Sequence, residues 1–339
     1  MWYDGAWLII RDRLNEFGRI LFSLTREQCY PLALATLIRV SGSSYRRTGA
    51  RLLIDAAGRK DGSISGGCLE EDLLARMAPD RATPDGRTIV TYDTTSENDL
   101  VWGVGLGCHG VVDILLEWFQ QPPPWVGAVQ ERWSRRQPLT LWIGAEGTRF
   151  PDAARAVPPP GVFVNSIQPP LALNVFGAGD DAQPLVQLAT RLGWTVTVLD
   201  PRPAFATAGR FPQASAVASA PVDDLVTRAS WDDRTAAVVM THHYNFDRPL
   251  LEKLLHLNLP YLGLLGPRRR ADRILADFVP PLPFSGKGAE VRLHAPIGLD
   301  LGGDGPEAVA LAILAEIQAV MTRRDAQPLR RRRSPIHAD

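Results

Sequence analysis

Residues 175–182 read Val-Phe-Gly-Ala-Gly-Asp-Asp-Ala and carry the strongest fold signal in the chain. An apolar run precedes this stretch, and an amphipathic run begins at its last residue. The spacing of Gly177, Gly179 and Ala182 matches the GxGxxA turn that joins a strand to a helix in a Rossmann fold. The sequence therefore predicts a strand, a glycine turn and a helix, which together begin a parallel α/β domain.

From residue 171 onward, apolar and amphipathic runs alternate, which is typical of a parallel sheet flanked by helices. Strands are predicted at 172–176, 195–199, 236–240 and 260–264. Helices are predicted at 182–192, 222–229, 247–257, 267–277 and 306–321. We therefore expect a Rossmann-like domain at 171–325.

Asp200 ends the second of these strands, about twenty residues beyond the glycine turn. In a dinucleotide site an acid at this place binds a ribose hydroxyl, so Gly177, Gly179 and Asp200 are candidate cofactor residues. Asp180 and Asp181 oppose this interpretation, because two carboxylates in the first helical turn would repel a pyrophosphate. The alternative is a Rossmann fold that keeps the turn without binding a dinucleotide.

His242 follows the third predicted strand, at the carboxyl edge where α/β sheets bind ligands. It is therefore a candidate residue of the ligand crevice. Its neighbour His243 would face the opposite way on an extended segment, so the two histidines are a poor chelating pair. Local hydrogen bonding is the alternative role for both.

Two turns rich in glycine and cysteine distinguish the first half of the chain. Residues 62–70 read Gly-Ser-Ile-Ser-Gly-Gly-Cys-Leu-Glu, which predicts a strand, a tight turn and a helix start. Residues 103–110 read Gly-Val-Gly-Leu-Gly-Cys-His-Gly. Glycine turns let a ligand approach the backbone, and N–H groups at a helix start attract anions and stabilise a thiolate. We interpret the two turns as halves of one site.

The candidate contacts in these turns are Cys68, Cys108, Gly66, Gly67 and Gly107. The two thiols are candidate contacts to a metal or to its sulfur. Two alternatives stay open for them, because a free cysteine is usually a small buried side chain and two thiols can also form a redox pair. Cys29 lacks a glycine-rich context and is interpreted as structural.

Arg46 and Arg47 lie in a loop that follows a predicted strand at 32–40. A guanidinium binds phosphate through two parallel hydrogen bonds, so both are candidate phosphate ligands; solvated loop charges are the alternative. The other elements predicted around this loop are strands at 51–55, 87–92 and 111–116, a helix at 68–78 and a hairpin at 139–150.

The composition favours a soluble two-domain protein of the cytoplasm. The chain has 339 residues and a formal net charge of +0, so no overall basic field attracts nucleic acid or a membrane surface. Its three cysteines cannot form a disulfide framework, which favours a reducing compartment. Charged residues interrupt the amphipathic run near the N-terminus, so this run is neither a signal peptide nor a membrane span.

Proline-rich sequence suggests the domain boundaries. We expect an α+β domain at 1–150, a linker at 151–170 and the Rossmann-like domain after it. The runs Pro158–Pro160 and Pro169-Pro170 within the linker flank one possible strand at 162–167. The end of the chain, 326–339, contains four consecutive arginines and is predicted to be a basic disordered tail.

Taken together, these motifs resemble the XdhC/CoxI family, the xanthine dehydrogenase accessory factors, over nearly the whole chain. In the first domain the resemblance rests on 33–36, 39–44, 47, 49–51, 62–70 and 105–108. In the second it rests on 176–179, 198–202, 240–242, 261–266 and 295–300. The stretch at 62–70 is the most specific of these motifs.

The resemblance implies an XdhC/CoxI-type N-terminal domain, a Rossmann-like C-terminal domain and a homodimer. It implies a chaperone, rather than an enzyme, that binds molybdenum cofactor as molybdopterin or its cytosine dinucleotide form. Such a chaperone protects the cofactor while a cysteine desulfurase supplies the terminal sulfur. It then inserts the cofactor into a molybdenum hydroxylase of the xanthine, aldehyde or carbon monoxide dehydrogenase type.

Two other functions are alternatives to the chaperone. One is an NAD(P)-dependent oxidoreductase that uses the Rossmann-like domain, which predicts saturable nicotinamide binding that is lost on Gly179→Val. The other is a thiol redox sensor, which predicts a reversible disulfide between Cys68 and Cys108 and no bound pterin.

Overall fold

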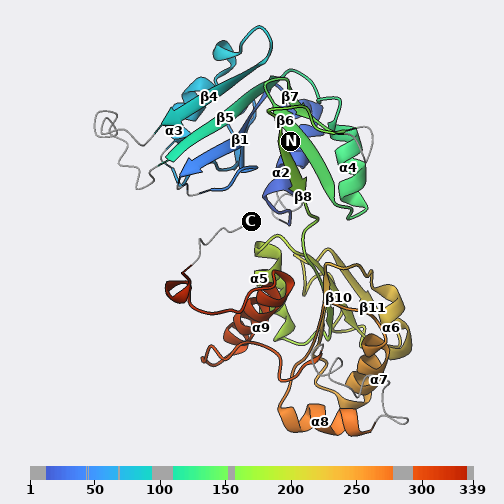
Figure 1. Ribbon diagram of the computed structural model, residues 1–339. Coiled ribbons are helices and arrows are strands. Elements are labelled where there is room, and N and C mark those ends of the chain that lie inside the picture. Colours follow the sequence, from blue (N-terminus) through green and yellow to red (C-terminus); the bar gives the residue numbers. More distant parts are fainter. Residues whose placement is uncertain are drawn as a thin grey trace. The chain divides into compact units, whose positions relative to one another are not determined.

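The computed structural model describes residues 13–42, 44, 46–67, 69–93, 110–151, 157–277 and 293–333. Three predicted site residues, Cys68, Gly107 and Cys108, lie outside these ranges. The chain divides into two compact units, one of residues 16–169 and the other of residues 170–339 grouped with the residues before 16. Figure 1 shows the elements of each unit.

The first unit contains two antiparallel sheets and three α-helices among its described residues. The larger sheet has the order β3-β2-β1-β5-β4 and the smaller one the order β7-β6-β8. The strands are β1 (Leu32–Gly42), β2 (Arg51–Ile54), β3 (Lys60–Gly62), β4 (Arg87–Asp93), β5 (Gly110–Phe119), β6 (Leu139–Gly144), β7 (Gly147–Arg149) and β8 (Phe163–Ile167). The helices are α2 (Glu16–Leu24), α3 (Glu70–Arg76) and α4 (Val126–Ser134).

Alternate residues of the central strands face two different hydrophobic clusters. In β1, Leu34 packs into the cluster formed with α2, α4 and β6, whereas Ala33 and Ala35 pack into the cluster that includes α3. In β5, Leu115 packs into the cluster with α2, α4 and β6, and Leu116 packs into the cluster with α3. Because successive side chains of a strand point to opposite faces, burial on both faces explains why these strands read as continuous apolar runs.

The strands predicted at 32–40, 51–55, 87–92 and 111–116 and the hairpin at 139–150 are confirmed. The possible strand at 162–167 is confirmed as β8, which lies inside the stretch predicted to be a linker. This strand pairs with β6 from Leu139↔Ile167 to Ile143↔Phe163, and Phe163 and Ile167 pack against the cluster with α2 and α4. The first unit therefore ends after its last strand, at Pro169.

The second unit contains a parallel sheet of the order β11-β10-β9-β12-β13-β14. Its strands are β9 (Ala172–Phe176), β10 (Thr195–Asp200), β11 (Ala216–Ser219), β12 (Thr235–Val239), β13 (Tyr261–Leu264) and β14 (Leu293–His294). Its helices are α5 (Ala182–Arg191), α6 (Val222–Arg228), α7 (Tyr244–Leu255), α8 (Arg268–Ala276) and α9 (Pro306–Met321). The predicted Rossmann-like architecture is confirmed.

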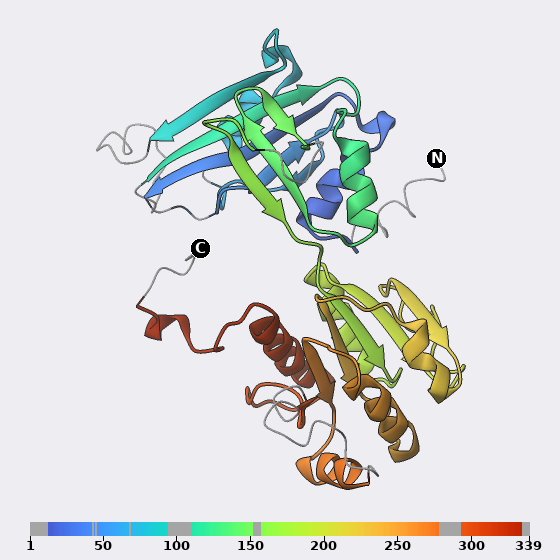
Figure 2. The ribbon, with the colours of Figure 1, turned by 45° about the vertical axis from the view of Figure 1, so that its right-hand side comes forward.

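Helices cover both faces of this sheet. Figures 1 and 2 show α5 and α9 on one face and α6 and α7 on the other, and each group packs into its own hydrophobic cluster. The edge strands β11 and β14 were not predicted, because β14 has only two residues and β11 consists of small residues that are exposed or only partly buried. No helix in the described ranges combines the length and the apolar composition needed to cross a membrane.

A partly buried polar cluster joins α9 to the sheet through the carboxylate of Glu316. The Tyr261 hydroxyl and the Gly298 N–H donate to Oε2 at 2.6 and 2.9 Å, and His294 Nδ1 lies 3.0 Å from Oε1. Burial would raise the pKa of Glu316, but the bonds from His294, Tyr261 and Gly298 outweigh it and lower that pKa. Glu316 is therefore more acidic in the folded chain than in the unfolded one.

This cluster predicts a loss of stability in acid. A carboxyl whose pKa is depressed by folding stabilises the protein above its unfolded pKa of about 4, and that contribution disappears as the pH falls through the folded pKa. We expect Glu316→Gln to unfold with a shallower pH dependence than the wild type below about pH 4, measured by urea unfolding. Glu307→Gln, an exposed change on the same helix, should keep the wild-type dependence. Equal profiles for wild type and Glu316→Gln would contradict the prediction.

Candidate functional site

The chain from Ile64 to Gly67 wraps around the carboxylate of Glu70, the first residue of α3. The N–H groups of Ile64 and Ser65 donate to Oε1 at 3.1 and 2.7 Å. The Gly67 N–H donates to Oε2 at 2.9 Å, and the Ser65 hydroxyl donates to the same oxygen. Burial would raise the pKa of Glu70, but these bonds outweigh it and lower that pKa. An ionised Glu70 therefore holds the turn that precedes Cys68.

The glycines of this turn are exposed on its outer side. Gly67 has a φ of +117°, which favours glycine, and a Cβ added there would meet no heavy atom within 4 Å. A ligand can therefore approach the backbone at Gly66 and Gly67. The Gly67 N–H already donates to Glu70, so a ligand would approach the exposed outer side of the turn without using that N–H.

The two candidate arginines lie on the loop between β1 and β2. Arg46 Nη2 lies 2.5 Å from Glu16 Oε1 at the start of α2, so its guanidinium has a partner within the protein. Arg47, the next residue, is exposed at the surface of the unit. A phosphate that bound Arg46 would share the guanidinium with Glu16 or displace it.

The predicted metal contacts, Cys68 and Cys108, lie outside the described residues. Among the described residues, no group of three or more His, Cys, Asp or Glu side chains is arranged to hold a metal ion.

In the second unit, the glycine turn after β9 packs against the end of β12. Gly177 has a φ of +126°, and a Cβ there would clash with the Met240 carbonyl group. Only glycine fits this position without displacing the backbone of the neighbouring strand. The packing of the neighbouring strand therefore explains the glycine at position 177, whether or not the turn binds a ligand.

Asp200, the predicted ribose ligand, is fully buried with 0% exposure. Its carboxylate accepts the Ala178 N–H at 2.7 Å and the Arg202 N–H at 2.8 Å. It also accepts two bonds from the Arg202 guanidinium, at 2.8 and 2.7 Å. Burial would raise the pKa of Asp200, but these bonds outweigh it and lower that pKa. Asp200 thus connects the glycine turn to Arg202. Its buried carboxylate is not accessible to a ribose hydroxyl.

His242 pairs with Asp181, so the structure brings two residues of the predicted crevice together. His242 Nε2 lies 2.6 Å from Asp181 Oδ2. Asp180 points away from this pair, with its side chain 94% exposed, and accepts a bond from Arg210 at 2.7 Å. The two neighbouring aspartates therefore have different roles.

Comparison with known proteins agrees with this architecture. Residues 173–317 match the family model described as the XdhC Rossmann domain, and residues 25–93 match that of the XdhC and CoxI family. A Bacillus subtilis protein named as a probable subunit of xanthine dehydrogenase is 33% identical over 333 residues, which span 90% of this chain and 97% of that protein. The chain belongs to the XdhC and CoxI family. The resemblance found in the sequence is thereby confirmed.

Two further relatives cover most of this XdhC-family chain. The Escherichia coli protein named molybdenum cofactor insertion chaperone PaoD is 24% identical over 290 residues, spanning 85% of this chain and 82% of that one. A crystal structure described as a xanthine dehydrogenase from Bacillus halodurans superposes with a TM-score of 0.75 at 28% identity. That match covers 91% of this chain and 97% of the other.

Sequence reasoning did not assign four partners in these sites: Glu70 for Gly67, Glu16 for Arg46, Arg202 for Asp200 and Asp181 for His242. The sequence held a local signal for Glu70, because it is an acidic residue at a predicted helix start. It held another for Arg202, which follows Asp200 by two residues in the order Asp-Pro-Arg. The Asp181–His242 pair spans 61 residues and has no local signal.

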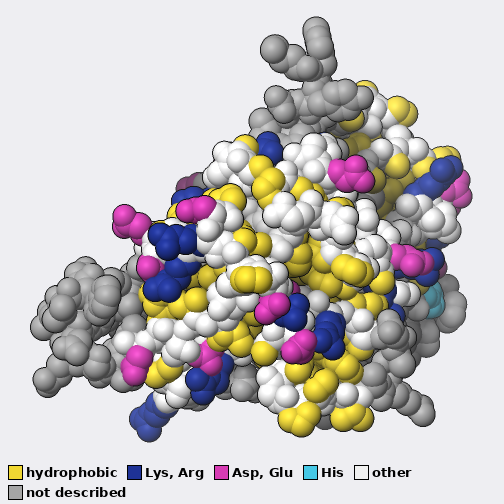
Figure 3. Space-filling view, turned by 90° about the horizontal axis from the view of Figure 1, so that it is seen from above, with side chains coloured by type: hydrophobic (Ala, Val, Ile, Leu, Met, Phe, Trp, Pro, Cys, Tyr) yellow, Lys and Arg dark blue, Asp and Glu magenta, His cyan; other side chains and the backbone are white. Residues whose placement is uncertain are grey.

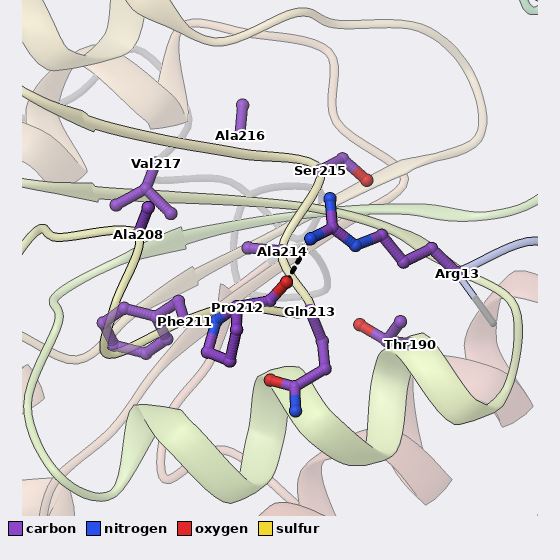
Figure 4. Close-up of a pocket in the computed structure, with 10 residues that line it drawn as sticks. All are labelled: Arg13, Thr190, Ala208, Phe211, Pro212, Gln213, Ala214, Ser215, Ala216 and Val217. Atoms are coloured by element: carbon purple, nitrogen blue, oxygen red, sulfur yellow. Dashed lines mark hydrogen bonds between the residues drawn. The ribbon is translucent and has the colours of Figure 1, made fainter. Parts of the chain in front are cut away.

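A pocket of about 590 Å³ lies beside β11 in the second unit (Figure 4). Its lining includes the apolar side chains of Phe211, Pro212 and Val217, and Arg13 reaches across it toward Pro212. Arg13 Nη2 donates to the Pro212 carbonyl oxygen, while Arg13 Nε is buried without a hydrogen-bond partner. No predicted site residue lines this pocket, so it is separate from the candidate sites.

Charges are mixed on the first unit. On the described part of the face shown in Figure 3, basic side chains lie beside acidic ones. The unit contains close ion pairs of this kind, such as Arg39–Asp113 and Arg76–Asp72, each at 2.6 Å. The face in Figure 3 thus presents basic groups next to acids rather than as one continuous basic surface.

Proposed function

We propose that this protein binds molybdenum cofactor as its cargo and inserts it into a molybdenum hydroxylase. The observation that carries the proposal is the turn held by Glu70, which exposes Gly66 and Gly67 directly before Cys68 in an XdhC-family chain. The names of two relatives support it, one being a molybdenum cofactor insertion chaperone and the other a probable subunit of xanthine dehydrogenase.

The residue chemistry suits this cargo. The cofactor carries a phosphate or a nucleotide, and its metal accepts thiolate ligands. In our proposal Cys68 and Cys108 contact the molybdenum or its sulfur, and the backbone at Gly66, Gly67 and Gly107 lies against the anionic part. Arg46 and Arg47 are the proposed phosphate ligands on a loop of the same unit, and Arg46 would bind the phosphate beside Glu16 or in its place.

The second unit supports a chaperone rather than a dehydrogenase. Its glycine turn packs against β12, and the Asp200 carboxylate that would bind a ribose is engaged by Ala178 and Arg202. We therefore assign cofactor binding to the first unit.

We extend the proposal to the cellular role. The protein would act in the cytoplasm as a homodimer, protect the cofactor while a cysteine desulfurase adds the terminal sulfur, and then load the hydroxylase apoenzyme. The cargo is molybdopterin or its cytosine dinucleotide form, and the client is a xanthine, aldehyde or carbon monoxide dehydrogenase type.

The test is anaerobic cofactor binding by the wild type, Cys68→Ala and Cys108→Ala, measured as molybdenum and pterin per chain. Cys29→Ala is the matched control, because Cys29 is a buried free thiol in the core of the first unit. We expect the wild type and Cys29→Ala to bind, and binding to fall at least tenfold in one or both of the other variants.

Three results would contradict parts of the proposal. Equal binding by all four proteins would remove the cysteines from the site. Binding of a nicotinamide dinucleotide without binding of the cofactor would support the dehydrogenase instead. A reversible disulfide between Cys68 and Cys108 in a protein that binds no pterin would support the redox sensor.

A further inference from the structure

The carboxyl ends of β9 and β12 form a topological switch point in the second unit. The two strands are neighbours in the sheet, but α5 after β9 packs on one face and α7 after β12 packs on the other. In sheets of this kind, the divergence of the chain on either side of such a point creates the crevice where ligands bind. Here the crevice is bordered by the turn at 177–181 and by Thr241 and His242.

The turn's backbone in this crevice is covered by the side chain of Asp181. A Cβ added at Gly179 would lie 2.6 Å from Asp181 Oδ1 and 4.0 Å from His242 Cδ2. In a dinucleotide site this second glycine leaves room for the pyrophosphate to approach the backbone. In this protein the space over Gly179 holds a carboxylate oxygen instead.

His242 holds that carboxylate in place. Its Nε2 lies 2.6 Å from Asp181 Oδ2, and its backbone has a φ of +59°, a conformation that is uncommon for residues other than glycine. The residues beside it support this conformation: Thr241 donates through its hydroxyl to the buried Asp247, and the His243 N–H donates to Thr241 Oγ1 at 3.1 Å. The pair thus joins the start of α5 to the loop after β12.

We propose that Asp181 is a specificity-determining residue of this crevice. Held by His242, its carboxylate occupies the position of a ligand phosphate and excludes nucleoside diphosphates and dinucleotides. The exclusion depends on where this one carboxylate lies, since Asp180 beside it points to solvent and pairs with Arg210. The inference concerns the second unit alone and does not depend on the cofactor role proposed for the first.

The test is calorimetric titration of the full chain with NAD⁺ and with adenosine diphosphate, which share the diphosphate group. The proteins are the wild type, Asp181→Ser and the matched control Asp180→Ser. We expect the wild type and Asp180→Ser to show no saturable binding up to about 1 mM, and Asp181→Ser to bind at least tenfold more tightly. Asp181→Asn, which keeps the shape and removes the charge, should gain affinity in the same direction.

Serine is well tolerated at the start of a helix, so Asp181→Ser should fold, which circular dichroism can check. If it does not fold, the same titration is made with Asp181→Asn. Saturable nucleotide binding by the wild type with the affinity of Asp181→Ser would overturn the proposal. So would the absence of any gain in both Asp181 variants. An equal gain in Asp180→Ser would overturn it too, because general charge repulsion would then explain the exclusion.

Discussion

Replacing Asp200 by asparagine is expected to lower the free energy of unfolding of the second unit by about 3 kcal/mol. The fully buried carboxylate accepts four hydrogen bonds, from the Ala178 N–H and from the backbone and guanidinium of Arg202. An amide of the same shape replaces one acceptor oxygen by a donor that faces other donors. The Arg202 side chain is 35% exposed, so water can solvate part of the freed guanidinium and keep the loss at the lower end of the range for buried ion pairs.

Denaturant unfolding measures this loss, and hydrogen exchange of peptides from 172–202 assigns it to the second unit. Asp180→Asn is the matched control, because its side chain is 94% exposed and its pair with Arg210 lies at the surface. We expect it to unfold like the wild type. If Asp200→Asn did so as well, the buried network would not stabilise the glycine turn.

Replacing Glu70 by glutamine is expected to loosen the turn at 64–67 and to weaken cofactor binding at least tenfold. The carboxylate accepts the N–H groups of Ile64, Ser65 and Gly67 and the Ser65 hydroxyl, and an amide can accept only part of these bonds. Loss of bonds to a charged group of this kind costs about 2 kcal/mol. Amide exchange in the turn should therefore become faster, and the cofactor should meet a backbone that is no longer held in one conformation.

Glu71→Gln is the control for this variant, because Glu71 is the next residue and is exposed. Exchange in the turn and cofactor binding should both stay at the wild-type level in it. Tighter cofactor binding by Glu70→Gln would contradict the prediction. That result would mean that Glu70 competes with the cofactor for the Gly67 N–H instead of preparing the turn.

Local sequence patterns were sufficient for most of the fold. The GxGxxA turn and the alternation of apolar and amphipathic runs predicted the parallel sheet, and the four strands expected in it are in place. The patterns were insufficient for two edge strands. Strand β14 has only two residues, and β11 consists of small residues that are exposed or only partly buried, so neither shows a clear apolar run.

The candidate sites were predicted less completely than the fold. Gly66, Gly67, Arg46, Asp200 and His242 were selected as groups that attract or approach a ligand, which is a property of residue type and local position. The structure adds a partner within the protein for four of them: Glu70 for Gly67, Glu16 for Arg46, Arg202 for Asp200 and Asp181 for His242. Each partner reduces what the residue can offer to a ligand.

The sequence by itself determined the Rossmann-like architecture, the membership in the XdhC and CoxI family and the positions of the glycine turns, because these depend on periodicity and spacing along the chain. Only the tertiary structure decided which charged groups are neutralised within the protein. Arg46 and Glu16 are 30 residues apart, and His242 and Asp181 are 61 apart. Such pairs form because folding brings distant side chains within hydrogen-bonding distance, and hydrogen bonds of this length act only over a few ångströms.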